Sequence, residues 1–308
     1  MSVFGRATFS AAGYAAARPK YPQSLFQKVL AYHDAKDSSG KLLDLGCGHG
    51  IIAKTLRPNF AEVLGVDPSA GMVKQASDSV NDTKITVRQG NAEDLSFLPD
   101  KSVDMVVAGQ AAHWFDYAKV WPELSRVVKP GGSLALWGYK DNLLIGHPRA
   151  NRIFDKFCYA DGEVEPGVEG MSHYWEPGRK IVRNLLRQVT VPAGEWECEQ
   201  RILCDIDPSM TEIPGEDKAW LRMKTTLAGF EGYVRTFSAL QGWKDSHPEV
   251  KSRAEGGQGD LADILMDRMV ESEPQWKALG DGWRDAEVEA VWGTYIILAK
   301  RTTSTVVE

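Results

Sequence analysis

The sequence contains few cysteines, and they are not spaced to bind a metal or to form a set of disulfides. Four of its 308 residues are cysteine, and none of them belongs to a C-x-x-C pair. The six histidines also lack the spacing of metal ligands, so we expect no metal site. Isolated cysteines of this kind are typical of proteins kept in a reducing compartment.

Long apolar runs and an excess of positive charge are also absent. No stretch is apolar enough to span a membrane, and the first residues lack the apolar core of a signal peptide. The net charge is −6, whereas a protein that grips nucleic acid needs a basic face that displaces counterions from phosphates. We therefore expect a cytoplasmic protein with no nucleic-acid or membrane partner. The sequence does not indicate an oligomeric state.

Tryptophan, in contrast, is abundant, and it is concentrated in the second half of the chain. Seven of the ten tryptophans follow Asp141. Because a Trp side chain buries a large apolar area, this skew predicts an aromatic-rich region there. We expect Trp292 in a final strand, and we assign four others to the packing of this region: Trp196, Trp220, Trp276 and Trp283.

Apolar runs alternate with helical patterns in the first half of the chain. Five short runs predict strands, at residues 41–45, 63–66, 85–87, 103–108 and 133–137. Such alternation is typical of a parallel sheet whose ligands bind at the carboxyl ends of the strands. The second half predicts helices over residues 181–186, 220–240 and 261–270, strands over 196–203 and 289–299, and a surface loop over 255–260. We therefore predict an α/β fold with a Rossmann-like, doubly wound seven-stranded sheet and helical cap insertions.

A glycine-rich turn follows the first predicted strand and opens a helix. Its glycines are Gly46, Gly48 and Gly50. Glycine patterns also occur in ordinary tight turns, but Asp67 ends the next strand, where a carboxylate can accept hydrogen bonds from a ribose diol. Asp44 stands directly before the glycines, where it would repel the pyrophosphate of a dinucleotide. The pattern therefore favours a cofactor that carries positive charge.

These residues resemble the class I S-adenosylmethionine (SAM)-dependent methyltransferases. In that family the glycine loop, with the acid matching Asp44, holds the methionine moiety and ribose, and the acid matching Asp67 binds the ribose. The other positions that match the family's cofactor site lie in the loop and after the second, third and fourth strands: Cys47, Met72, Asn91, Ala92, Glu93 and Gln110.

A narrower resemblance extends over nearly the whole chain. Distinctive strings lie at residues 14–22, 112–116, 137–139, 174–179, 233–239 and 291–295. They are similar to those of the fungal trans-aconitate methyltransferase family, whose members convert a carboxylate of a small acid into a methyl ester. Relatives in that wider family act on other acids, so the resemblance implies a small carboxylic acid substrate without fixing which one.

The resemblance also implies how the chain is divided. We expect an N-terminal arm over the cofactor (1–27), a SAM-binding core with five strands (28–141), a helical cap with the substrate region and a sixth strand (142–287), and the last strand with the C-terminal tail (288–308). In the arm, Arg18 is expected on the methionine carboxylate, with Tyr14 or Tyr21 lining the channel. Alternatively, Arg18 belongs only to a bend before the first helix.

An ionised carboxylate is already a nucleophile, so methyl transfer to it needs no general base, only positioning and a cationic partner. Arginine suits that task because its planar fork matches a carboxylate. Arg179 and Arg235 lie in aromatic-rich strings of the predicted cap, and we predict that both bind substrate, although surface ion pairing is the alternative. The other predicted substrate contacts are aromatic: Trp114, Tyr139, Trp175 and Tyr233.

His113 follows the fourth strand, where class I enzymes place residues that face the methyl group. We predict it as the catalytic residue, either hydrogen-bonded to the substrate or acting as a base if the acceptor is a hydroxyl. Two alternatives stay open: a methyltransferase for a hydroxyl or carbon acceptor in secondary metabolism, and a protein that binds SAM without transferring its methyl group.

Overall fold

The computed structural model describes residues 19–34, 39–210, 214–215 and 218–303. Its main feature is an eight-stranded sheet of order β3-β2-β1-β4-β5-β10-β8, to which β9 adds by pairing with β10. The first five strands run parallel, and β10 runs antiparallel to β5, β8 and β9. Their bounds are β1 Lys41–Leu45, β2 Glu62–Asp67, β3 Ile85–Gln89, β4 Val103–Gly109, β5 Val128–Leu144, β8 Trp196–Cys204, β9 Arg222–Thr226 and β10 Glu287–Arg301.

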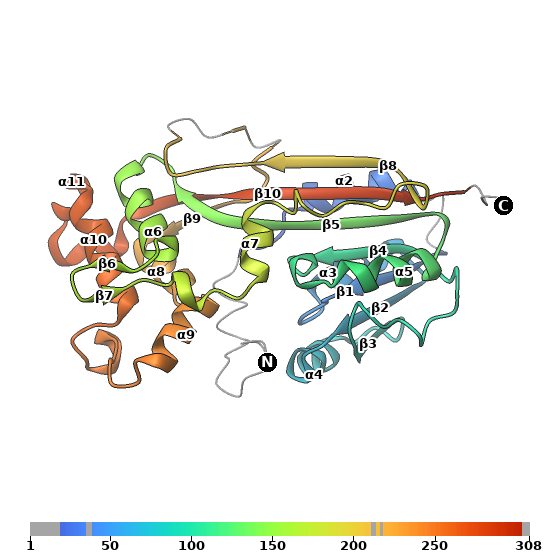
Figure 1. Ribbon diagram of the computed structural model, residues 1–308, viewed down its shortest axis with the longest axis horizontal. Helices are drawn as coiled ribbons and strands as arrows, with labels where there is room; N and C mark the ends of the chain where they lie inside the picture. Colours follow the sequence, from blue (N-terminus) through green and yellow to red (C-terminus); the bar gives the residue numbers. More distant parts are fainter. Residues whose placement is uncertain (1–18, 35–38, 211–213, 216–217, 304–308) are drawn as a thin grey trace.

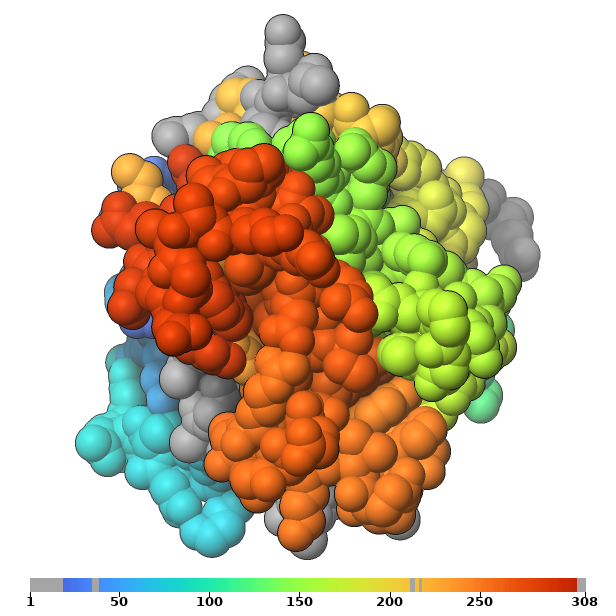
Figure 2. Space-filling view, turned by 90° about the vertical axis from the view of Figure 1, so that its left-hand side faces the viewer, coloured from blue at the N-terminus to red at the C-terminus, as the bar shows by residue number. Residues whose placement is uncertain are grey.

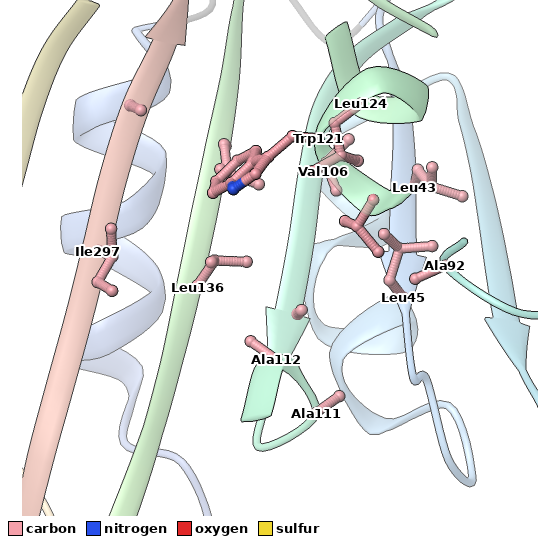
Figure 3. Packing of buried hydrophobic residues seen from close by; sticks show 14 of the residues in the cluster. Leu43, Leu45, Ala92, Val106, Ala111, Ala112, Trp121, Leu124, Leu136 and Ile297 are labelled. Carbon is pink, nitrogen blue, oxygen red and sulfur yellow. The ribbon is translucent and has the colours of Figure 1, made fainter. Parts of the chain in front are cut away.

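Helices cover both faces of the parallel part of the sheet, because successive strand residues point to opposite faces. Leu42 of β1 packs in a cluster with α2 (Gln23–His33) and α3 (Ile51–Leu56). Leu43 packs in a second cluster with α5 (Tyr117–Val127) and the residues that follow α7 (Gly178–Arg183). Figure 3 shows this second cluster, with Trp121 of α5 beside Leu136 of β5. The remaining helix of this half, α4 (Ala70–Ser79), follows β2.

The cap is built on the far ends of β5 and β10, which extend well beyond the parallel strands (Figure 1). β8 pairs with one end of β10, and β9 pairs with the other end. A large apolar cluster joins these extensions to the cap helices, and Figure 2 looks onto this end of the molecule. The cap elements are α6 Pro148–Tyr159, β6 Glu163–Glu165, β7 Val168–Glu169, α8 Leu227–Val234, α9 Ser238–Ser246, α10 Leu261–Ser272 and α11 Pro274–Lys277. Residue 141, the expected end of the core, lies inside β5.

Most of the predicted elements are confirmed. The five core strands, the strands predicted over 196–203 and 289–299, and the helices predicted over 181–186 and 261–270 are present, with bounds that differ by a few residues. The helix predicted over 220–240 is confirmed only in part, because residues 227–234 form α8 and α9 begins at Ser238. Its first part is strand β9, and Thr226 then caps α8 by accepting a hydrogen bond from the Gly229 amide at 3.2 Å. Two β-branched threonines at the end of β9 favour the strand, which periodicity alone did not reveal.

Tryptophan packing follows the prediction with one exception. Trp276 is buried in the cap cluster, Trp283 packs against it, and Trp292 lies in β10. Trp220 contacts both the cap cluster and the cluster beside α2. Trp196 is not a cap residue: it belongs to the α5 side of the core, with its ring centroid 6.1 Å from that of Trp121. It begins β8, and β8 pairs with the core end of β10.

Candidate functional site

The glycine turn is held in place by the strand beside it. The amides of Gly46 and Cys47 both donate to the carbonyl of Val66, at 2.8 and 3.1 Å. Gly46 has φ +68°, a left-handed conformation that strains other residues. A Cβ at Gly46 would also lie 2.3 Å from the Cβ of Ala111, in the loop after β4. The position therefore requires glycine for two separate reasons, and the backbone of β1 closely approaches that of the β4 loop.

Asp67 ties the end of β2 to the same turn. Its Oδ2 accepts a hydrogen bond from the Gly48 amide at 2.9 Å, and its Oδ1 accepts one from the Ser69 amide at 2.8 Å. Burial raises the pKa of Asp67 above its usual value, although both amides act to lower it. Each carboxylate oxygen keeps a second lone pair, so Asp67 can still accept hydrogen bonds from a ligand.

Asp44 lies fully buried beneath the turn. Its Oδ2 accepts a hydrogen bond from the Ala53 amide at 3.1 Å, whereas no partner for Oδ1 is found among the residues that the structure describes. Burial raises the pKa of Asp44 to about 7. A buried carboxylate with an unsatisfied oxygen is stabilised by positive charge nearby. This feature fits a cationic cofactor and disfavours an anionic one.

A cavity of about 380 Å³ opens at the carboxyl ends of the parallel strands. This volume lies in the range of small-molecule sites, roughly 300–1,000 Å³. Its wall includes most of the predicted cofactor residues and two of the predicted substrate residues: Gly46, Cys47, Gly48, Asp67, Met72, Asn91, Ala92, Glu93, Gln110, Trp114 and Tyr139. The structure thus brings together residues that follow the ends of β1 to β4, and Tyr139 from within β5.

Some predicted residues are not in this wall. Asp44 and Gly50 support it from behind, and Tyr14 and Arg18 lie outside the described residues. The wall contains Tyr21, which was predicted to line the channel, and also residues that were not predicted to bind a ligand, among them Lys20, Ile51, Ser69 and Phe115. Phe115 could have been predicted from the sequence, because it lies next to Trp114 in the same aromatic string. Lys20 is the only lysine or arginine in the wall that the described residues form.

Arg179 is held on the cap side by side chains from three elements. Its Nη2 donates to Asp141, at the cap end of β5, and its Nε donates to the Tyr159 hydroxyl at 2.8 Å. The guanidinium lies 4.4 Å from the ring centroid of Trp175. Burial would raise the pKa of Asp141, but the guanidinium groups of Arg179 and Arg183 hold it below its usual value. Within the described part of the chain, Nη1 of Arg179 makes no hydrogen bond.

Helix α7, which carries Arg179, packs against the loop after β4. Gly178 packs so closely on the loop after β4 that a Cβ there would lie 2.9 Å from the His113 carbonyl and from the Trp114 ring. Trp114 lines the cavity and is 42% exposed, so it forms part of the mouth. Arg179 itself is not in the cavity wall, but it directly follows the residue that touches the wall. Trp175, also outside the wall, packs on the cap cluster and donates from Nε1 to the Cys158 carbonyl at 2.7 Å.

Arg235 is placed differently, and the structure contradicts its predicted role. Its guanidinium donates to Asp260 at 2.8 Å, to Asp263 at 2.9 Å and to Glu231 at 2.9 Å. Asp260 and Asp263 are buried at the start of α10, where Asp260 also caps the helix. Three carboxylates occupy the donors that a substrate would need, so Arg235 joins α8 to α10.

Tyr233 and His113 are buried and do not belong to the described cavity wall. The Tyr233 hydroxyl accepts a hydrogen bond from Nε1 of Trp292 at 3.0 Å, inside the cap cluster. His113 is 7% exposed and lies beneath α7, with its ring centroid 4.8 Å from that of Trp114. Its position outside the cavity wall therefore does not support the catalytic role predicted for His113.

The described residues contain neither a cluster of metal ligands nor a membrane-spanning helix. Among the described residues, no three or more histidine, cysteine, aspartate or glutamate side chains gather closely enough to hold a metal ion. No helix within the same described ranges is both long and apolar enough to cross a bilayer.

Comparison with known proteins identifies the family. The model of the family described as "Methyltransferase domain" matches residues 43–136, from β1 into β5. "Methyltransferase AacuQ" of Aspergillus aculeatus is 31% identical over 301 residues, covering 94% of this chain and 92% of that protein. The "Probable S-adenosylmethionine-dependent methyltransferase CRG1" of Saccharomyces cerevisiae is 28% identical over 273 residues, covering 85% of this chain and 88% of that protein.

A solved structure agrees over the whole length. The "Putative Type II Methyltransferase from Anaeromyxobacter dehalogenans" has a TM-score of 0.62 at 25% identity, covering 93% of this chain and 99% of that one. The glycine turn, the acid at the end of β2, and strands β2, β3 and β4 lie within the region that the family model matches. The chain therefore belongs to the class I S-adenosylmethionine-dependent methyltransferases.

Proposed function

We propose that the protein transfers the methyl group of SAM to a carboxylate oxygen of a small organic acid, forming a methyl ester. One observation carries the proposal: Arg179, fixed by Asp141 and Tyr159, keeps Nη1 without a hydrogen bond among the described residues and directly follows Gly178, which packs on the cavity wall. A guanidinium whose Nε and Nη2 are fixed by hydrogen bonds, and whose Nη1 can still donate, suits an anionic acceptor. The narrower resemblance to the fungal trans-aconitate methyltransferases is part of this proposal.

The sheet order supports an orientation for the cofactor. The loops after β2 and β3 lie at one side of the cavity, and the loop after β4 with Tyr139 of β5 lies at the other. We assign the nucleoside to Asp67, Met72 and the 91–93 segment, and the methionine end to the glycine turn above Asp44. This leaves Gln110, Trp114 and Tyr139 around the reacting methyl group. Arg18 and Tyr14 complete the proposed cofactor site from the N-terminal arm.

The reaction requires no acid–base catalyst from the protein. Bound SAM supplies a methyl group on a positive sulfur; transfer breaks the C–S bond and forms a C–O bond, with the electron pair staying on sulfur. A carboxylic acid with a pKa near ~4 is ionised at neutral pH, so no proton needs to be removed. His113 therefore has no proton to take, in agreement with its buried position. Arg179 orients the acceptor, and the apolar wall excludes water.

A panel of organic acids with methyl-labelled SAM tests the proposal. We expect label in a product that mild base hydrolyses to methanol, with one S-adenosylhomocysteine (SAH) formed per ester. A base-stable ether or C-methyl product would instead support a hydroxyl or carbon acceptor, with His113 as the candidate base. Tight SAM binding without turnover on any acid, phenol or alcohol in the panel would contradict methyl transfer to small molecules.

A further inference from the structure

The residue that ends the parallel pairing of β4 has an unusual backbone. Gln110 has φ +53°, in the left-handed region that residues other than glycine seldom adopt. Its amide donates to the Trp137 carbonyl of β5 at 2.8 Å, the last backbone hydrogen bond between these neighbours. Beyond it the chain turns away from the sheet into the short helix Ala112–Trp114. Such strain persists where surrounding contacts enforce it.

Beyond the last backbone hydrogen bond, the side chain of Gln110 continues the hydrogen bonding to β5. Its Nε2 donates to the Tyr139 carbonyl at 2.9 Å, and its Oε1 accepts from the Tyr139 amide at 2.8 Å. These two bonds reproduce the donor and acceptor that a neighbouring strand residue would offer. Both Gln110 and Tyr139 line the cavity, so the paired groups form part of its wall.

Packing prevents the Gln110 amide from moving. A Cβ at Gly138 would lie 2.5 Å from Oε1 of Gln110 and 2.5 Å from the hydroxyl of Tyr295, so only glycine leaves room for the amide. Tyr295 is fully buried in β10, on the far side of β5. The amide is therefore packed between the Tyr139 backbone and the side of β5 on which Tyr295 lies.

We propose that Gln110 is a positioning residue: its side-chain amide clamps the Tyr139 backbone and thereby sets the Tyr139 ring against the methyl group of bound SAM. The clamp explains why the strained conformation of Gln110 is retained, because that backbone geometry directs the amide toward β5. This inference rests on the cofactor and not on the identity of the acceptor. It can therefore fail or succeed independently of the proposed ester formation.

The bound methyl group itself is the probe. We would record the proton–carbon NMR correlation of [methyl-¹³C]SAM on the full chain, without any acceptor. An aromatic ring next to the methyl group displaces its proton resonance, so Tyr139→Leu should return it toward the position of free SAM. Gln110→Met, of similar volume but unable to form the clamp, should move it in the same direction by at least a third as much.

A second variant separates the clamp from general stability. In Gln110→Glu the ionised carboxylate can accept from the Tyr139 amide but faces the Tyr139 carbonyl without a donor; protonation restores both bonds. Enclosure raises the pKa of such a carboxyl. We therefore expect a displaced methyl resonance at pH 7.5 that returns to the wild-type position near pH 5.5. Tyr295, the titratable group facing the amide from β10, has its pKa held well above its usual value by burial and does not titrate here.

His49, Asp67 and Glu93 line the cavity, and His113 and Asp44 lie near it, so wild-type protein at each pH serves as the reference. A wild-type methyl resonance in Gln110→Met, or a Gln110→Glu spectrum that follows the wild type at both pH values, would overturn the proposal. So would an unchanged resonance in Tyr139→Leu. If Gln110→Met does not fold, the pH dependence of Gln110→Glu alone decides.

Discussion

The two sides of the cavity are held together by different kinds of contact. On the cofactor side, backbone amides make most of the hydrogen bonds. The Gly48 amide donates to Asp67, 19 residues away, and the amides of the glycine turn donate to the Val66 carbonyl. On the cap side, charged side chains far apart in sequence meet, as Arg179 and Asp141 do across 38 residues. A backbone-built site depends on a few glycines and acids at strand ends, whereas a side-chain-built site depends on which distant partners the fold brings together.

The largest effect is expected where the backbone-built side is broken. In Gly46→Ala the new Cβ would lie 2.3 Å from Ala111, in a left-handed conformation. We expect SAH affinity to fall more than ~1000-fold, equivalent to about 4 kcal/mol. Isothermal titration calorimetry measures this directly.

Gly146→Ala is the matched control in the cap. Gly146 also has a positive φ, +80°, but among the described residues, its chain neighbours aside, no atom lies within 4 Å of the added Cβ. It should cost about 1–2 kcal/mol of stability and leave SAH affinity unchanged. Near-wild-type affinity in Gly46→Ala would show that the turn tolerates a side chain and that the comparison is wrong.

The next effect concerns a side-chain contact of the cap. Arg235→Met leaves Asp260 and Asp263 buried without their cation, so we expect a loss of about 2–4 kcal/mol in unfolding free energy. Arg253→Met, which breaks a half-exposed pair with Asp267, should cost below about 1 kcal/mol. Urea denaturation compares them. A stable Arg235→Met protein with impaired acceptor binding would restore Arg235 as a substrate ligand.

A smaller effect should appear in the pH dependence of cofactor binding. The pKa of Asp44 in the free protein is raised by burial to about 7, so the native state holds a proton that the unfolded chain releases near pH 4. The stability of the free protein should therefore fall as pH rises from 5 to 7. A cationic cofactor favours the ionised carboxylate, so SAM affinity should rise several-fold between pH 6 and 7.5.

Asp44→Asn removes that proton and keeps the shape of the side chain. The variant should show a flatter pH dependence of both stability and SAM affinity, with titration of SAM itself cancelling in the comparison. Equal slopes in the two proteins, measured by calorimetry and thermal unfolding across this pH range, would show that Asp44 does not sense the cofactor's charge.

The same contrast explains how much the sequence could predict. The glycine turn, Asp67 and the first five strands follow from local pattern, since alternating apolar runs and strand-end glycines determine them within short windows. The clamp of Gln110 on Tyr139 and the pairing of Arg179 with Asp141 depend on registers and distances that only the folded chain defines. Arg235 shows the limit of prediction from local sequence. It lies in an aromatic-rich segment, as Arg179 does, but its partners Asp260 and Asp263 are too far away in the sequence to be predicted from that segment.

The most direct test of the account is the Michaelis constant of Arg179→Met for the acid found with labelled SAM. Arg183→Met is the matched control, since Arg183 pairs with the same Asp141 but also with Asp155 and is more exposed. We expect KM for the acid to rise about 30-fold or more in Arg179→Met, equivalent to ~2 kcal/mol for a charged hydrogen bond, with SAH affinity unchanged. KM should change less than about three-fold in Arg183→Met. An unchanged KM in Arg179→Met, or equal increases in both variants, would contradict the assignment of the acceptor to the cap side.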